Sequence, residues 1–297
     1  MFENILGNEK NKDVLEKSIK LNKISHSYIF WGIEGIGKKL IAKEFAKKIL
    51  CLQNNVDNCT CKSCIEFDGS NNPDFQLIEP NEGKVKIEQI REMQRKVAEK
   101  PIISNKKVYV IDGSDTMTTE AQNCLLKTLE EPPEYITIIL ICTNEDNLLS
   151  TIKSRCTRMQ FESIEIEEIK KYIKQNYPEE EISENIINLS QGSIGKVLKL
   201  NENKHIYENI EKIFLNMQNK DLIEIVQMSE EIYKSKEEIN SILDYMNVIL
   251  LKLSKQNIKY IRCIEIVEQT KKRLKANSNY DMCIDNLLFN MTFIIHN

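Results

Sequence analysis

The feature that most constrains how this chain folds is a glycine-rich segment at residues 32–39, Gly-Ile-Glu-Gly-Ile-Gly-Lys-Lys. It matches the first seven positions of the phosphate-binding pattern G-x-x-x-x-G-K-[ST]. The apolar segment Tyr28–Trp31 precedes it, and Lys39–Leu50 follows with apolar residues at helical spacing. A strand, a glycine loop and a helix in this order predict a phosphate-binding loop. The alternative is a glycine-rich turn between strand and helix that binds no ligand.

Residues of this loop are the first candidates for contacts with a nucleotide. Glycine at positions Gly32, Gly35 and Gly37 lets backbone N–H groups face phosphates at a helix N-terminus, and Lys38 would reach the outer phosphates. The last position is Lys39, where the pattern has a hydroxyl that holds Mg²⁺. A protonated lysine cannot ligate a cation. Directed inward it would replace part of the metal's charge; we favour the outward, solvated orientation.

A second pattern of nucleotide hydrolases follows at Val108–Ile111, an apolar strand that ends in Asp112. Asp112 is a candidate for orienting Mg²⁺ or its water. The next residue is Gly113, where a hydrolase would carry a glutamate that polarises the attacking water. Asp115 could take the place of this glutamate, but it lies three residues after Asp112. A general base must first be within reach of the proton it removes, whatever its pKa. We therefore interpret residues 113–116 as a turn into the next helix.

Short apolar segments alternate with helix-period segments over the first 160 residues. This pattern is typical of a parallel sheet with helices on its faces. Further strands are expected at Phe75–Ile78 and Ile136–Cys142, and helices at Val85–Lys100 and Thr119–Glu130. The predicted fold class is therefore α/β, with a P-loop parallel-sheet domain at residues 1–161.

The rest of the chain is expected to be helical, with a small helical domain at 162–203 and a larger one at 204–297. The net charge of −4 argues against a general nucleic-acid coat, because such proteins need an excess of basic residues. The first ten residues lack the apolar core of a signal peptide, and no segment is apolar enough for a membrane span. We expect a cytoplasmic location with reduced thiols.

Four of the nine cysteines lie within fourteen residues, spaced C-x7-C-x-C-x2-C: Cys51, Cys59, Cys61 and Cys64. Four thiolates so close together in a reducing compartment match a tetrahedral structural Zn²⁺ site. The alternative is a set of unrelated thiols, since the C-x-C step is tighter than the usual C-x2-C. We predict a zinc module in an insertion at residues 51–64, with no catalytic role.

Two polar residues follow the buried strand that ends at Cys142. Asn144 is a candidate for sensing a γ-phosphate, although asparagine after a strand is often turn chemistry. Arg155 follows a short amphipathic segment and is a candidate for reaching a neighbouring molecule's nucleotide. The alternative for Arg155 is a salt bridge at the surface or between domains.

Taken together, these residues resemble the bacterial clamp-loader family of DNA polymerase III, which are AAA+ proteins. The resemblance rests on residues 2–8, 26–32, the cysteine cluster, Asn123–Pro133, Thr143-Asn144 and Ser154-Arg155-Cys156, which occur in the family's order. It covers about the first 200 residues and is strongest to the delta-prime group, whose members act as a stator.

The resemblance implies three domains: an AAA+ domain with a zinc module, a helical lid and a helical collar that holds a hetero-pentameric ring. It implies gamma/tau ATPase subunits and a delta subunit as partners, the sliding clamp and primer-template DNA reached through the complex, and Arg155 acting on a neighbour. Lys39, Gly113 and Gly195, the last in place of a lid arginine, depart from active members. We therefore doubt ATP/Mg²⁺ as a cofactor and expect no hydrolysis. The alternatives are a self-sufficient ATPase of gamma/tau type, a DNA-repair remodeller or a free-standing adaptor.

Overall fold

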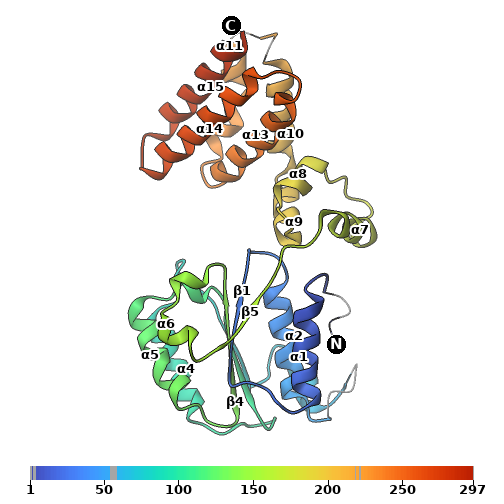
Figure 1. Cartoon of the computed structure of the whole chain (residues 1–297), viewed down its shortest axis with the longest axis vertical. Coiled ribbons are helices and arrows are strands. Elements are labelled where there is room, and N and C mark those ends of the chain that lie inside the picture. Colours follow the sequence, from blue (N-terminus) through green and yellow to red (C-terminus); the bar gives the residue numbers. More distant parts are fainter. Residues whose placement is uncertain (1, 3–4, 54–58, 218, 221, 297) are drawn as a thin grey trace. The chain divides into compact units, whose positions relative to one another are not determined.

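The computed structural model of the chain describes residues 2, 5–53, 59–217, 219–220 and 222–296, coloured in Figure 1. They form two compact units. One comprises Met1–Glu168 together with Ser193–Gly195, and the other comprises Ile169–Gly192 together with Lys196–Asn297. The finer division of the helical part at residue 203 remains a prediction.

A five-stranded parallel sheet in the order β2-β3-β4-β1-β5 forms the centre of the first unit. The predicted α/β class with a P-loop parallel sheet is thereby confirmed, and four strands fall where the apolar segments predicted them. The edge strand β5 was not predicted. The strands are β1 (Ser27–Trp31), β2 (Phe75–Ile78), β3 (Lys107–Ile111), β4 (Ile136–Cys142) and β5 (Thr157–Gln160).

Helices cover both faces of this sheet (Figure 1). Along β3, Val108 and Val110 pack into the core on the side of α1 (Glu9–Lys20) and α2 (Lys38–Leu50). The alternate residues of the strand pack on the side of α4 (Ile87–Val97) and α5 (Thr119–Glu130). All of β4 is buried, as a strand covered on both faces requires.

Short elements connect the strands and the longer helices, and the 3₁₀ turns among them lie at the carboxyl ends of β3 and β4. The short elements are α3 (Lys62–Asp68), the 3₁₀ turns η1 (Ser114–Thr116) and η2 (Glu145–Asn147), and α6 (Ser150–Lys153). Helix α5 begins after Thr118, whose hydroxyl accepts the Ala121 N–H at 3.2 Å, and it ends just before Pro132-Pro133. Its predicted bounds are confirmed.

The described residues of the second unit are helical, as expected. Apolar stripes on α13 and α15, including Leu243 and Leu287, are buried in its core. None of the helices in the described part of the chain combines the length and apolar character needed to cross a bilayer. Two of the helices, α7 and α9, start in the first unit. The helices are α7 (Ile166–Asn176), α8 (Glu184–Leu189), α9 (Ile194–Glu202), α10 (Lys204–Asn216), α11 (Leu222–Met228), α12 (Glu230–Lys234), α13 (Ile239–Ser254), α14 (Lys259–Lys275) and α15 (Tyr280–His296).

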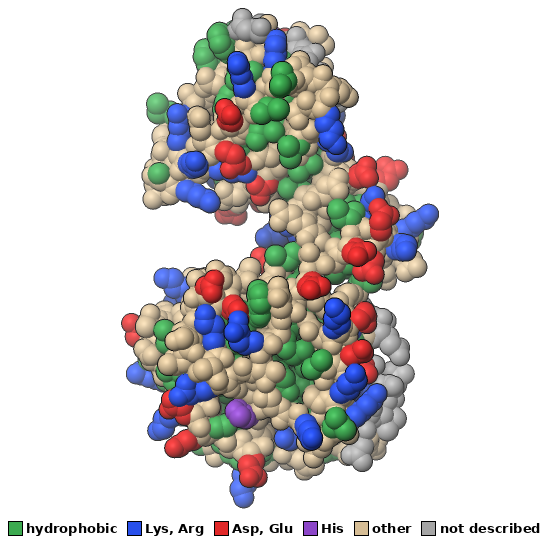
Figure 2. Space-filling model, viewed as in Figure 1, with side chains coloured by type: hydrophobic (Ala, Val, Ile, Leu, Met, Phe, Trp, Pro, Cys, Tyr) green, Lys and Arg blue, Asp and Glu red, His purple; other side chains and the backbone are tan. Residues whose placement is uncertain are grey.

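Basic and acidic side chains are interspersed on the face of the α/β unit drawn in Figure 2. This mixture agrees with the small net charge of −4. Binding by this face would therefore depend on the placement of individual side chains more than on a uniform field.

Candidate functional site: a phosphate loop and an exposed arginine

The glycine loop connects β1 to α2, as predicted. Gly35 and Gly37 adopt positive φ angles of 77° and 89°, which favour glycine, and Gly37 is the N-cap of α2. Gly32 has no room for a side chain, because an added Cβ would lie 2.3 Å from the carbonyl oxygen of Phe161. The three glycines are therefore explained by the geometry of the loop.

The Lys38 ammonium is bonded to carbonyl groups of its own loop. Its Nζ donates to the carbonyl oxygens of Gly32 at 2.5 Å and Ile33 at 2.6 Å, and the residue is buried. Burial lowers the pKa of Lys38 below its ordinary value. The side chain predicted to reach the outer phosphates thus lies within the loop.

The Lys39 side chain does not point into solvent, which corrects the orientation favoured from the sequence. Its Nζ forms an ion pair with Glu79 and lies 3.1 Å from a carboxylate oxygen of Asp112. Burial alone would lower the pKa of Lys39, but the hydrogen bonds that its ammonium donates to the two carboxylates outweigh burial and raise this pKa. Sequence reasoning missed Glu79, whose position directly after β2 places it at the carboxyl edge of the sheet.

These residues do not fit a bound Mg²⁺ ion. Position 39 offers an ammonium instead of a hydroxyl, and both oxygens of Asp112 have donors. Oδ2 receives Lys39, and Oδ1 receives the backbone N–H of Gly113 at 3.1 Å. Magnesium requires oxygen ligands that are free to coordinate it. The Lys39 ammonium therefore pairs with Asp112, the acidic residue predicted from the sequence to orient Mg²⁺.

Gly113 is fixed as glycine by the backbone. Its φ angle is +63°, and an added Cβ would lie 2.8 Å from Cγ of Pro80. A glutamate at this position would have to adopt a left-handed conformation and displace Pro80. The local backbone geometry therefore disfavours a glutamate that could polarise water at this position.

Asp115 is engaged in holding the loop after β4. Its Oδ2 accepts the backbone N–H groups of Thr143 at 3.1 Å and Asn144 at 3.0 Å. The Asn144 side-chain oxygen in turn accepts the N–H of Asp146 at 3.0 Å and caps η2. Both residues thus make turn contacts, which were the alternative to a catalytic role for Asp115 and a sensing role for Asn144.

The segment around Gly195 contacts the phosphate loop within the first unit. The Gly195 N–H donates to the carbonyl of Gly35 at 3.0 Å. A Cβ on Gly195 would lie 3.0 Å from Cα of Gly35, so a larger residue would require one of them to move. The loop thus has a backbone contact where active relatives were expected to place an arginine.

Arg155 lies two residues after the end of α6, and its side chain is about one-third exposed. Its Nη1 donates to the carbonyl of Thr151 at 2.8 Å, and its Nη2 lies 2.9 Å from the carboxylate of Glu130. Its own carbonyl accepts the hydroxyl of Ser27 at 2.7 Å, which fixes the backbone to β1. The intrachain salt bridge considered from the sequence therefore exists, with a partner that sequence reasoning did not name.

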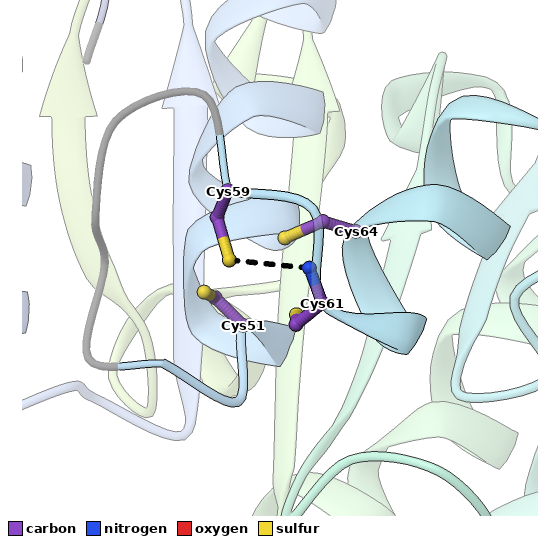
Figure 3. Close-up of side chains that lie close together, drawn as sticks. All are labelled: Cys51, Cys59, Cys61 and Cys64. Atoms are coloured by element: carbon purple, nitrogen blue, oxygen red, sulfur yellow. Dashed lines mark hydrogen bonds between the residues drawn. The ribbon is translucent and has the colours of Figure 1, made fainter.

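The four cysteines predicted to bind a metal come together (Figure 3). Cys51 follows α2, Cys61 caps the start of α3, and Cys64 lies within that helix. The four Sγ atoms lie within 4.8 Å of one another. Part of the intervening insertion, residues 54–58, lies outside the described residues. Four thiols at this spacing can hold a tetrahedral metal ion.

One thiol of the cluster is biased toward its ionised form. Burial alone would raise the pKa of Cys61, but backbone hydrogen bonds from Leu52 and Cys64 lower it to about 6. The backbone N–H of Cys61 also contacts Sγ of Cys59 at 3.4 Å. Thiolates are the form that binds a metal. Burial raises the pKa of Cys64, so Cys61 is the thiol of this pair that ionises first.

Comparison with known proteins gives a consistent set of relatives. Residues 7–165 match the family described as "DNA polymerase III, delta subunit". The chain is 31% identical over 204 residues to the DNA polymerase III subunit delta' of Bacillus subtilis, covering 67% of this chain and 61% of that protein. It is 32% identical over 209 residues to the tau/gamma subunit of Haemophilus influenzae, covering 68% of this chain and 30% of that one. The chain thus spans less than two thirds of these relatives.

A solved structure with a similar fold is the gamma subunit-related protein of DNA polymerase III from Thermotoga maritima. It superposes with a TM-score of 0.59 at 16% identity, over 95% of this chain and 99% of that one. At this identity the likeness concerns the fold, including the helical region that follows the parallel sheet.

Proposed function

The chain belongs to the DNA polymerase III clamp-loader family, and we propose that it is a delta-prime-like subunit of such a loader. In this role it is a stator in a hetero-pentameric ring with gamma/tau ATPase subunits and a delta subunit. The ring uses ATP to load a sliding clamp onto primer-template DNA. This chain supplies an arginine to a neighbour and does not hydrolyse ATP itself.

The observation that carries the proposal is the pairing of Lys39 with Asp112. A hydrolysing subunit needs a metal ligand at each of these positions. Here Lys39 offers an ammonium, and Asp112 is paired with that ammonium. Gly113 has no space for the carboxylate that would polarise water. The site supports a subunit whose own loop is structural.

Arg155 is the residue through which the chain would act on a neighbour's nucleotide. An arginine supplied in trans neutralises charge that develops on the transferred phosphoryl group, and it contributes about 10³–10⁵ in rate. Arg155 is partly exposed and its backbone is held by Ser27, so the guanidinium is presented from a fixed point beside the start of β1.

Reconstitution with the gamma/tau and delta subunits tests this role. Arg155→Ala should leave folding and ring assembly intact and lower the DNA-stimulated ATPase of the complex by about 10³ or more. Arg158→Ala is the matched control, because Arg158 lies on β5 and pairs with Glu145 of its own chain. An unchanged rate for Arg155→Ala would refute the role in trans.

Two observations favour a second candidate, a self-sufficient ATPase of gamma/tau type or a related DNA-repair remodeller. The loop keeps the first seven positions of its pattern, and the Haemophilus influenzae tau/gamma subunit is about as similar as the delta' protein. This candidate predicts metal-dependent ATP turnover by the purified chain at about 1 s⁻¹ or faster. Without such turnover, the stator proposal stands.

We further propose that Cys51, Cys59, Cys61 and Cys64 bind one structural Zn²⁺ ion. The support is the proximity of their Sγ atoms and the closed, all-cysteine donor set. The ion would join the end of α2 to the start of α3 and would play no part in chemistry.

A further inference from the structure

Glu130 occupies a position that is unfavourable for a carboxylate unless it has a partner. It is the last residue of α5, and the two prolines that follow Glu131 prevent the helix from continuing. The carboxyl end of a helix carries partial negative charge, so an acidic side chain there is disfavoured. The Arg155 guanidinium, 2.9 Å away, compensates for that charge.

The same contact fixes Arg155 from a second direction. The carbonyl of Thr151, on α6, accepts from Nη1 at 2.8 Å, while Nη2 lies 2.9 Å from the carboxylate of Glu130, on α5. Two anchors on different helices define both the direction of the side chain and the plane of the guanidinium. Arginine has five N–H donors, so these contacts leave donors for a phosphate group.

We propose that Glu130 is a positioning residue for the arginine that this chain offers to a neighbour's nucleoside triphosphate. Its carboxylate does not touch the nucleotide. It restricts Arg155 to one orientation before the neighbour binds, so less side-chain freedom is lost when the guanidinium meets the phosphates. The inference rests on the proposed function of Arg155 and assigns a role to the acidic end of the Asn123–Pro133 motif.

Steady-state kinetics of the reconstituted complex test this role. Glu130→Gln keeps the length of the side chain and removes its charge. Because an exposed ion pair is a modest interaction, we expect kcat for ATP to fall about 1.5- to 5-fold with KM unchanged. Glu130→Asp should produce a similar fall, since it keeps the charge but shortens the reach. Glu131→Gln, a change at the exposed neighbouring residue, is the matched control and should have no effect.

A double-mutant cycle separates this inference from the proposed function. If Glu130 acts through Arg155, Glu130→Gln should cause no further loss in the Arg155→Ala background. The same fold loss in both backgrounds, an unchanged kcat or a raised kcat would each overturn the positioning role, while the trans arginine would stand. No effect of Arg155→Ala itself would overturn both.

Discussion

Replacing Lys39 by methionine tests whether its ammonium takes part in the structure of the nucleotide site. Methionine and lysine have similar lengths and similar helix propensities, so the change removes mainly the charge. Lys39 contacts two carboxylates, Glu79 and Asp112, and all three side chains are partly exposed. At roughly 0.2–1 kcal/mol for each contact, the free energy of unfolding should fall by about 0.4–2 kcal/mol.

Urea denaturation followed by tryptophan fluorescence measures this change. Trp31, the single tryptophan of the chain, lies at the end of β1 beside the loop and reports on the α/β unit. Lys43→Met on the same helix is the matched control, because Lys43 forms no ion pair among the described residues. The difference between the two variants should shrink at 1 M salt, where the Debye length is about 3 Å.

The pH dependence of this difference has a definite sign. The pKa of Lys39 is raised in the folded protein, so its contribution is fully present below its unfolded value of about 10.5. It is lost as pH rises through the folded pKa. Lys39→Met should therefore be less stable than the wild-type chain at pH 7–9, and the two should converge above about pH 10.5. Equal stability of Lys39→Met and Lys43→Met at low salt and pH 7 would refute the interaction.

Two further variants or treatments address the other parts of the site. Gly113→Glu supplies the missing carboxylate, but the glutamate would have to adopt a positive φ. The variant should therefore have a free energy of unfolding lower by about 1–2 kcal/mol in the same urea assay, and it should show no ATPase activity. A stable variant that hydrolyses ATP would contradict this geometric argument. Elemental analysis should find one zinc per chain, and its removal by a chelator should lower the melting temperature of the α/β unit; a zinc-free chain with an unchanged melting temperature would refute the assignment.

The parallel sheet was predictable because its buried strands are continuous apolar segments. Ile136–Cys142 is buried at every position, and its bounds were predicted without error. Strand β5 escaped prediction because only Met159 of its four residues is buried. An edge strand with polar residues on three of four positions has no apolar periodicity to detect.

The contacts of the site were less predictable because they join residues far apart in the chain. Glu79 lies 40 residues from Lys39, and Gly195 contacts Gly35 through backbone atoms that carry no side-chain signal. The prediction that the Lys39 side chain points outward was wrong for this reason. Only the order of strands in the sheet brings the carboxylates at the ends of β2 and β3 to the first turn of α2.

The cysteine cluster was predictable because its members are close in sequence. A spacing of fourteen residues limits how far the four thiols can separate, and the structure brings their Sγ atoms within 4.8 Å. The proximity of the four Sγ atoms does not determine which metal ion they bind, so zinc remains a proposal. The same holds for the trans role of Arg155, since its target would belong to another chain.

The most direct test of the account is the ATP turnover of the reconstituted complex with Arg155 intact and replaced by alanine. The account predicts a fall of about 10³ or more, with assembly of the complex unchanged. Equal turnover in the two complexes would contradict it.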